Sequence, residues 1–231
     1  FIFMAVLASG SWLWTFFRLP ETLPLDKRRP LTFKGIVGGF RIVFTNRMAI
    51  SYGLAGTFLF GALFGFISSS QQIYVDIFGL GEYFPVAFAA MAGLMAVSSF
   101  TNSRIVRRFG MRRLSHGAML SFTGFSIIWL GFALTGFMPL WLFFPLLAVI
   151  MFSFGWAAPN MNSLSMEPLG AVAGSASAVF GFIQTVGGAV IGGYVGQMFN
   201  NTTIPVAIGY AGMGILSLIC ILIAENGRLF G

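Results

Sequence analysis

The sequence predicts an all-α membrane protein, namely a six-helix transmembrane bundle preceded by a partial helix. Of the 231 residues, 57% are hydrophobic and only 8% are charged, whereas soluble domains carry about 25% charged residues. The apolar residues come in runs close to the roughly 20 residues that a helix needs to cross a hydrocarbon core about 30 Å thick. Runs such as LAGTFLFGALFGFI lack the alternation of apolar and polar side chains that strands of a membrane barrel show.

The chain opens with an apolar segment, residues 1–17, that has no initiator methionine and no positively charged start. Both features argue against a signal peptide. We expect this segment to be the tail of a truncated transmembrane helix, and the sequence to be a fragment of a longer protein.

Residues 18–47 carry seven of the 13 Lys and Arg residues and are expected to form a basic cytoplasmic loop between two helix bundles. Apolar residues spaced by three, four and seven predict a helix that lies in the membrane interface, with Lys34 and Arg41 off its apolar side. The apolar residues are Phe33, Ile36, Val37, Phe40, Val43 and Phe44. An irregular linker stays open as an alternative, because three glycines weaken this helix.

The remainder, residues 48–231, is predicted to form the six-helix transmembrane bundle. Its spans are expected near 48–70, 84–102, 115–135, 138–158, 172–196 and 204–224. The connection at 103–114 contains five arginines and is separated from 18–47 by two spans, so both basic segments lie on one side. The positive-inside rule makes that side cytoplasmic, and the C-terminus is then cytoplasmic too. The connection at 159–171 has no Lys or Arg and adds nothing to this assignment.

Small residues spaced by four occur twice in the last third of the chain. Gly170, Gly174 and Ala178 form the first set, and Gly188, Gly192 and Gly196 form the second. Such spacing puts small residues on one side of a helix and lets another backbone approach closely. We therefore predict helix packing at Gly174, Gly188, Gly192 and Gly196, which is compatible with helices that slide during transport.

Charge and residue content exclude several other classes. The net charge of +7 is concentrated in 18–47 and 104–113, which fits loops facing anionic membrane lipids and not a nucleic-acid groove. Cys220 is the one cysteine and is expected to be a buried, inert thiol. A single histidine and the lack of a Cys/His cluster predict no metal and no cofactor. No set of nucleophile, base and metal ligands suggests an enzyme.

Four stretches of the sequence together carry a family resemblance. They are RLPETL after the first helix, FISSSQQIYVDIFGLGEYFPVAFAAMA, NSRIVRRFGMRR and GSASAVFGFIQTVGGAVIGGYVG. They resemble the C-terminal half of the bicyclomycin-resistance (Bcr/CflA) branch of the major facilitator superfamily. The resemblance covers essentially the whole chain, with 1–17 matching the end of helix six and the rest matching helices seven to twelve. It implies a multidrug:proton antiporter of the bacterial inner membrane, whose partners are the missing N-terminal six-helix bundle, protons and drug molecules.

The arginine-rich stretch VRRFGMRR resembles the second-half copy of the family's basic loop motif, roughly G-x-L-A-D-R-x-G-R-R. Arg108, Gly110 and Arg112 match, but Arg107 occupies the place of the motif's aspartate. The resemblance implies that this loop ties helices together and holds one state of alternating access, and the lost acid puts that role in question. Alternatively, the arginines only set topology and bind anionic lipids, at about 1 kcal/mol per charge. The residues concerned are Arg104, Arg107, Arg108, Gly110, Arg112 and Arg113.

Transporters of this kind bind substrate near the membrane midplane and couple to protons through an intramembrane acid or histidine. All six acidic residues fall in predicted loops or span ends, and His116 falls at the start of a span. The resemblance therefore implies that the coupling acid lies in the missing half. This half is expected to supply an adaptable wall rich in Phe and Met. The polar candidates for substrate binding are Gln184, Gln71, Gln72, Tyr74, Asn160 and Asn162, and each can also be explained by hydrogen bonding between helices.

Two other functions remain compatible with the sequence. One is export of a metabolite, since related bundles move amino acids or sugars. The other is a non-transporting membrane module, because half a transporter cannot enclose a cleft by itself.

Overall fold

We describe the protein from a computed structural model, in which residues 1–20 and 33–230 are described. The chain divides into two compact units, residues 1–36 and 37–231, and each is treated by itself. In the first unit, α1 (Ile2–Arg18) is a regular helix with every side chain exposed. It coincides with the apolar segment predicted at 1–17.

A helix, α2 (Phe33–Thr45), occupies the end of the segment 18–47. Val43 is fully buried, whereas Val37, Phe40 and Phe44 are exposed. Residues 21–32, and the side chains of Phe33, Lys34 and Ile36, lie outside the described residues. The location of α2 in the membrane interface stays a prediction.

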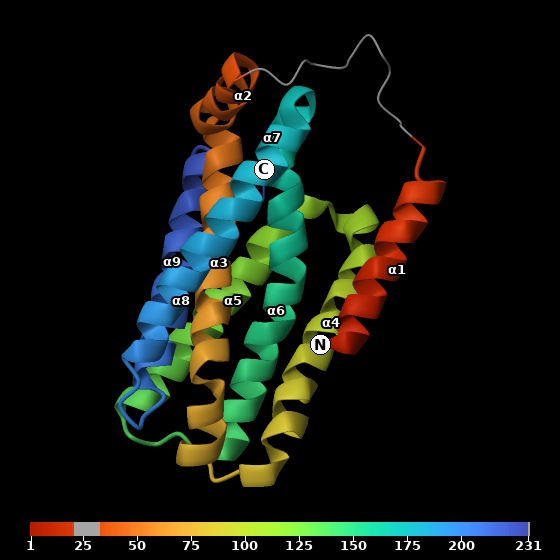
Figure 1. Ribbon diagram of the computed structural model, residues 1–231. Coiled ribbons are helices and arrows are strands. Elements are labelled where there is room, and N and C mark those ends of the chain that lie inside the picture. Colours follow the sequence, from red (N-terminus) through yellow and green to blue (C-terminus); the bar gives the residue numbers. More distant parts are fainter. Residues whose placement is uncertain (21–32, 231) are drawn as a thin grey trace. The chain divides into compact units, whose positions relative to one another are not determined.

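The second unit is a helical bundle, and no strand occurs among the described residues (Figure 1). Short π-helical and 3-10 turns, labelled η, interrupt its α-helices. In chain order the elements are α3 (Arg47–Gln71), π-helical η2 (Gln72–Ile77), 3-10 η3 (Gly81–Tyr83), α4 (Phe84–Phe109), α5 (Met111–Leu134), α6 (Leu140–Met166), 3-10 η4 (Glu167–Val172), α7 (Ala173–Phe182), π-helical η5 (Ile183–Gly187), α8 (Gly188–Gln197) and α9 (Ile204–Ala224).

Five helical runs among the described residues are long and apolar enough to cross a membrane. The fourth, Leu140–Gln197, has 58 residues, which is about 87 Å of helix and far exceeds a hydrocarbon core of about 30 Å. Leu169 breaks this run with a non-helical backbone (φ −111°, ψ 17°). The chain turns back there, so that α6 and the α7–α8 segment form two legs (Figure 1). With this division the bundle has the six legs that the sequence predicts.

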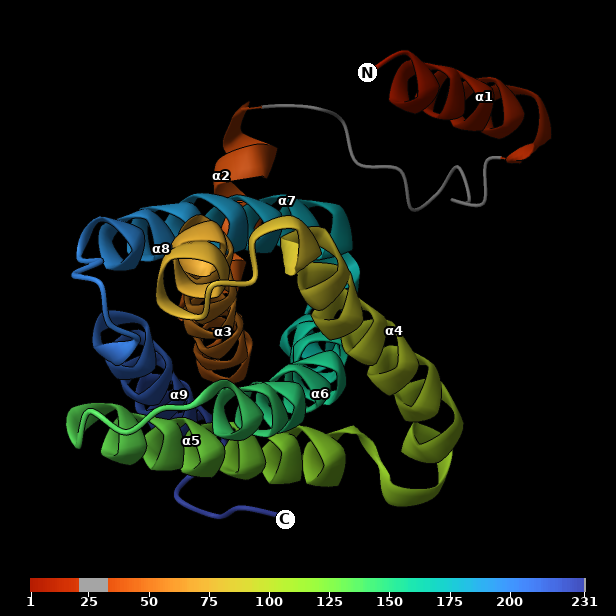
Figure 2. The same cartoon turned by 90° about the horizontal axis from the view of Figure 1, so that it is seen from below.

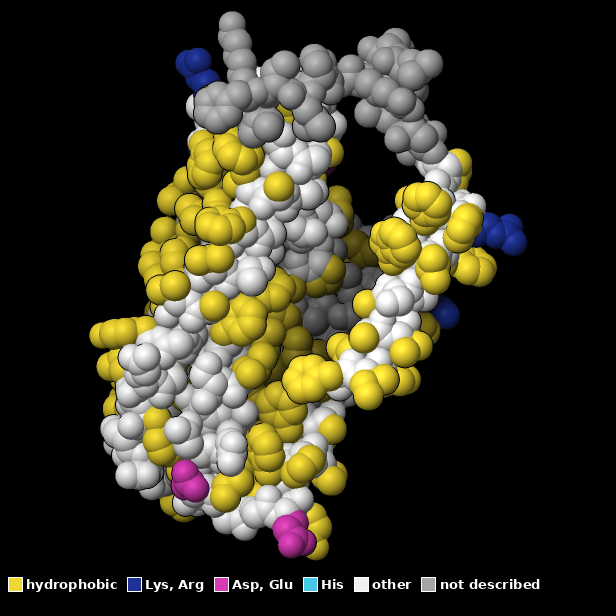
Figure 3. Space-filling view, viewed as in Figure 1, with side chains coloured by type: hydrophobic (Ala, Val, Ile, Leu, Met, Phe, Trp, Pro, Cys, Tyr) yellow, Lys and Arg dark blue, Asp and Glu magenta, His cyan; other side chains and the backbone are white. Residues whose placement is uncertain are grey.

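Helix α3 lies at the centre of the bundle. It packs against α6, α8 and α9, while α5 packs against α6 and α9, and α4 packs mainly against α6 (Figure 2). Its side chains Tyr52, Leu59 and Phe66 are almost completely buried. Hydrophobic side chains also cover much of the bundle's outer surface (Figure 3), as expected of helices that face lipid or another apolar partner.

Glycines let α8 approach α3 closely. A Cβ atom at Gly192 would lie 2.4 Å from Cβ of Phe64 and 2.6 Å from the backbone nitrogen of Gly65. Added Cβ atoms at Gly188 and Gly196 would also meet α3, at 3.0 Å and 2.8 Å from the nearest atom. Gly174 departs from the predicted packing role, because nothing lies within 4 Å of a Cβ placed there. The first half of the small-residue pattern thus has a different environment from the second.

Two connections predicted as loops are largely helical. Helix α4 continues to Phe109 and α5 starts at Met111, so the predicted connection 103–114 reduces to Gly110, with φ 81° and ψ 155°. Helix α6 continues through Pro159 to Met166. Residues 159–166 are therefore helical, although they were predicted to belong to the connection 159–171. Proline is tolerated inside membrane helices because neighbouring groups satisfy the freed carbonyl. The carbonyl that Pro159 leaves without a backbone donor is that of Gly155, and Ser99 Oγ of α4 donates to it at 3.5 Å.

Candidate functional site

A pocket of about 390 Å³ lies between α3, α6 and the α7–η5 leg. Helix α3 contributes an aromatic ring, α6 contributes one face, and the third leg contributes small residues and an amide. The lining residues are Phe60, Ala158, Pro159, Asn162, Met166, Ser177, Gly181 and Gln184. The pocket therefore brings together two of the six predicted polar candidates, Asn162 and Gln184.

Gln184 enters the pocket from the π-helical turn η5. Single π-helical turns widen a helix locally and are frequent at functional sites. The side chain lies against α3, since a Cβ atom at Gly56 would be 2.9 Å from Gln184 Nε2. Because Gly56 has no side chain, the amide group of Gln184 can occupy this space.

Helical spacing explains the α6 side of the pocket. Ala158, Asn162 and Met166 are separated by four residues and so lie on one face of the helix. Asn162 is exposed within the bundle, and its side chain is therefore accessible to a ligand.

The chemistry of this pocket is neutral. Its polar groups are the amides of Asn162 and Gln184 and the hydroxyl of Ser177, and none of its described lining residues is charged. Phe60 and Met166 supply apolar, adaptable surface. Such a pocket suits a small uncharged molecule that can both donate and accept hydrogen bonds.

The structure does not bring the other polar candidates into this pocket. Asn160 is buried and its Nδ2 donates to Asn102 Oδ1 at 2.7 Å, which links α6 to α4. Tyr74 is fully buried in η2, with ring centroids 5.9 Å from Phe66 and 6.0 Å from Phe143. Gln71 is exposed at the end of α3, and Gln72 is half-buried in η2. These four residues belong to the helix contacts or to the far end of the bundle.

At the opposite end of the bundle from η2, a group of ion pairs surrounds Arg112. We call this the arginine end, defined by Arg47, Arg112, Glu167 and Glu225. Arg112 Nε is 2.9 Å from Glu225 Oε1, and Arg112 Nη2 is 3.4 Å from Glu167 Oε2. The carboxylates that pair with Arg112 thus come from distant parts of the chain.

The other arginines of the stretch have different surroundings. All four are exposed. The guanidinium groups of Arg104 and Arg108 lie 4.9 Å and 5.5 Å from the ring centroids of Phe100 and Phe109. The positive φ of Gly110 produces a tight turn between α4 and α5. Because this turn is one residue long, Arg112 falls in the first turn of α5.

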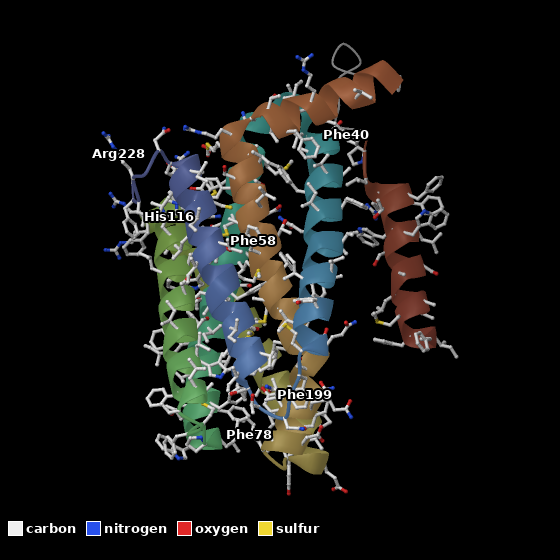
Figure 4. All side chains as sticks on the ribbon, turned by 90° about the vertical axis from the view of Figure 1, so that its left-hand side faces the viewer. Phe40, Phe58, Phe78, His116, Phe199 and Arg228 are labelled. Atoms are coloured by element: carbon white, nitrogen blue, oxygen red, sulfur yellow. The ribbon has the colours of Figure 1, made fainter. Side chains whose placement is uncertain are left out.

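His116 and Glu225 belong to the same cluster, which sequence reasoning missed. His116 is fully buried, although its position at a span start suggested an interface residue. Its Nε2 is 2.8 Å from the hydroxyl of Tyr52, and that hydroxyl donates to Glu225 Oε1 at 2.7 Å. Figure 4 shows His116 near Arg228, at the end of the bundle opposite Phe78 and Phe199.

The pKa of Glu225 reflects this environment. Burial acts to raise the pKa of its carboxyl group, but the hydrogen bonds from Tyr52 and Arg112 and the positive charge of Arg112 outweigh burial. The net effect lowers the pKa below its usual value. Glu225 is therefore ionised at neutral pH and anchors the end of α9 to α3 and α5.

Comparison with known proteins assigns the family. The model of the Major Facilitator Superfamily matches residues 1–192, which is well over half of the chain. The chain belongs to the Major Facilitator Superfamily. This membership, together with the apolar helices, makes the chain a multi-pass membrane protein.

Two curated superfamily relatives are similar to the chain. The Bicyclomycin resistance protein homolog of Haemophilus influenzae is 27% identical over 208 residues, which cover 88% of this chain and 51% of that protein. The Uncharacterized MFS-type transporter YdgK of Bacillus subtilis is 29% identical over 190 residues, covering 80% of this chain and 46% of that protein. The chain spans about half the length of these relatives. No solved structure matches it significantly.

The resemblance to the bicyclomycin-resistance branch is thus confirmed as a similarity to a named relative. The all-helical bundle of a superfamily member is confirmed as well. Among the described residues, no group of three His, Cys, Asp or Glu side chains could hold a metal ion.

Proposed function

We propose that the protein containing this chain exports small, uncharged drug-like molecules across the bacterial inner membrane, with proton movement as the driving force. The observation that carries this proposal is the neutral pocket in which the amides of Asn162 and Gln184 lie beside Phe60 and Met166. The similarity to a bicyclomycin resistance protein homolog supports a drug as the substrate.

The pocket would form one wall of the transport pathway. Asn162, Ser177 and Gly181 are exposed in the bundle, so the pocket opens to its surroundings. In secondary transporters, substrate sites lie between two repeats or bundles. We expect a second six-helix bundle to cover this face, with the arginine end in the cytoplasm beside anionic lipids.

The two amide groups would orient the substrate by hydrogen bonds. The apolar side chains would bind substrates of different shapes. An amide offers two donors and one acceptor oxygen, so it can pair with carbonyl, hydroxyl or amide groups of different drugs. Phe and Met surfaces re-pack around different ligands. The proton that drives export would bind an acid in the second bundle, which fits the lack of a charged residue among the described lining of this pocket.

The proposal is tested by drug accumulation in efflux-deficient bacteria. The cells express the complete reading frame that contains this chain, or the chain alone, and are exposed to bicyclomycin with and without a protonophore. We expect only the complete protein to lower accumulation, and the protonophore to abolish the effect. If neither form changes accumulation although both reach the membrane, drug export is the wrong function, and metabolite export or a non-transport role takes its place.

Gln184 is the residue whose removal should separate binding from folding. We predict that Gln184→Ala in the complete protein weakens drug export about two- to tenfold, the loss expected for one hydrogen bond, without lowering protein abundance. Thr185→Ala is the matched control, because Thr185 is exposed on the same π-helical turn but does not line the pocket. Unchanged export by the Gln184 variant at equal abundance would remove Gln184 from the substrate site.

A further inference from the structure

The hydrogen bonds around His116 fix which of its ring nitrogens carries the proton. The backbone N–H of Phe230 donates to His116 Nδ1 at 3.3 Å, so Nδ1 must be unprotonated. The single proton of the Tyr52 hydroxyl is given to Glu225, so Tyr52 can only accept from His116 Nε2. Two independent contacts therefore require the neutral imidazole with its hydrogen on Nε2.

A proton added to this imidazole has one place to go, which is Nδ1. The Nδ1–H bond would then point at the N–H of Phe230, and two donors would face each other across the present 3.3 Å contact. The contact between the rings of His116 and Phe230, 5.9 Å apart at an interplanar angle of 64°, depends on the same placement. Protonation thus replaces the hydrogen bond between Phe230 and His116 with a repulsion between two N–H groups.

We propose that His116 is a proton-binding site, and that its protonation releases the end of the C-terminal segment 226–230, namely Leu229 and Phe230, from the arginine end of the bundle. The proton comes from the solution at that end and forms an N–H bond at Nδ1. The hydrogen bond from Phe230 breaks, and no other covalent bond changes. This site lies in the bundle that the sequence suggested would contain no proton site.

The end of the C-terminal segment is held in a backbone conformation that it would not keep by itself. Phe230 has a φ of 66°, in the left-handed region that disfavours residues with bulky side chains. Such conformations persist only where surrounding contacts impose them. Losing the contact at His116 therefore favours release of the segment.

Charged groups from each neighbouring element influence the proton on His116. Glu225, linked through the Tyr52 hydroxyl, stabilises an imidazolium, and Arg112 on the same helix opposes it. Glu167 from η4 partly neutralises Arg112. From the start of α3, Arg47 donates to Asn226 Oδ1 and to the Ala224 carbonyl oxygen. Arg228 is exposed on the segment itself.

Arg47 and Glu225 keep the beginning of the segment in place after release. Neither contact involves a His116 nitrogen, so protonation leaves both intact. The N–H groups of Gly227 and Arg228 also keep their bonds to the carbonyl oxygens of Leu222 and Glu225, at 2.8 Å and 3.1 Å. The movement is therefore confined to Leu229 and Phe230, which directly follow Arg228. It changes the surface of the arginine end without unfolding α9.

Spin-label mobility on the C-terminal segment tests the proposal without measuring transport. In the complete protein, Cys220 and any cysteine outside this chain are replaced by serine, and Arg228→Cys supplies an exposed attachment site. Between about pH 8 and about pH 5, the range in which histidine titrates, we expect the ratio of mobile to immobile label to follow a one-proton curve. Around the midpoint of that curve, the ratio of mobile to immobile label should rise about tenfold for each unit by which the pH falls.

His116→Asn is the decisive comparison. An asparagine side chain can place an amide oxygen where Nδ1 was, so it can accept from Phe230, but it does not titrate. We expect the label in this variant to stay immobile across the whole range. A pH-independent label in the unsubstituted protein, or the same titration in His116→Asn, would overturn the proposal.

Tyr52→Phe provides a second measurement that retains the histidine, in case the asparagine variant does not fold. Removing the hydroxyl disconnects His116 from the negative charge of Glu225. The midpoint of label release should therefore shift to lower pH. An unshifted midpoint would mean that another group titrates. Because no drug is present, these results do not depend on the proposed export function.

Discussion

Gly192 determines how closely α8 approaches α3. We predict that Gly192→Ala destabilises the protein by about 1 to 3 kcal/mol, the usual effect of overpacking. The new methyl group would lie 2.6 Å from the backbone carbonyl carbon of Phe64 and 2.6 Å from the backbone nitrogen of Gly65, and a rotamer change cannot move these atoms. The measurement is the thermal unfolding midpoint of the purified complete protein in detergent.

The neighbouring Gly193 offers a matched control. Nothing lies within 4 Å of a Cβ atom at Gly193, and alanine is the better helix former by about 1 kcal/mol. Gly193→Ala should therefore leave the midpoint unchanged or raise it. Equal effects of the two substitutions would show that close packing at Gly192 is not what limits stability.

Individual residues differ in how well the sequence predicts their roles. The spacing of Gly188, Gly192 and Gly196 is a local pattern, and so their placement on one helix side can be read directly. The pairing of Arg112 with Glu225 joins positions 113 residues apart, and nothing in the sequence near either residue indicates it. His116 was misassigned for the same reason, because its burial depends on Tyr52 and on the C-terminal segment.

At the level of helices, Asn102 and Asn160 connect α4 to α6. We predict a coupling of about 0.6 kcal/mol, and at most about 1.7 kcal/mol, in a double-mutant cycle of Asn102→Ala and Asn160→Ala, the range found for hydrogen bonds between membrane helices. The bond is short, at 2.7 Å, and both side chains are buried. Thermal unfolding of the four proteins in one detergent gives the coupling.

The cycle has an internal control two residues away. Asn162 lies on α6 but lines the pocket and is exposed. Pairing Asn102→Ala with Asn162→Ala should give additive effects. Additivity in the Asn160 cycle would instead mean that the Asn102–Asn160 bond contributes nothing beyond its separate residues.

Helix existence could be predicted more reliably than helix ends. Apolar run length reflects the thickness of the membrane and therefore locates the six legs. The ends depend on local contacts: α4 extends past the predicted limit with Arg107 and Arg108 in its last turn, where positive charge interacts favourably with the helix dipole. The π-helical turns η2 and η5 arise within continuous helices and leave no mark in the apolar pattern.

For the whole molecule, the ion pair at Glu225 predicts a pH dependence of stability. The folded-state pKa of Glu225 is lower than its usual value of 4.5. The stabilisation is therefore fully present above that value and is lost as pH falls through the folded-state pKa. We predict that the gap in unfolding midpoint between the protein and its Glu225→Gln variant is largest near neutral pH and closes below about pH 4.

Glu82→Gln is the control for this comparison, since it removes an exposed carboxylate at the other end of the bundle. The same detergent and ionic strength are used throughout. A gap that stays constant as the pH falls would contradict the assignment of Glu225 as an ionised anchor.

The bundle as a whole follows from composition and run length, whereas its pocket does not. The sequence indicated that Gln184 needed an explanation, because a polar side chain in the middle of an apolar leg is costly. Nothing in it indicated that Asn162 and Gln184 would line one pocket while Asn160 would turn towards α4. That division depends on the 100° step between successive residues of α6 and on which helix each face meets.

The one-residue connection at Gly110 also fixes the rotation of α5 about its own axis relative to α4. Because no flexible loop separates α4 from α5, adding or deleting a single residue there would rotate α5 about its axis by about 100° relative to α4. Arg112 and His116 would both turn away from Glu225 and Tyr52. Chain length at Gly110 is therefore constrained as well as residue identity, and natural variants should have neither insertions nor deletions at this point.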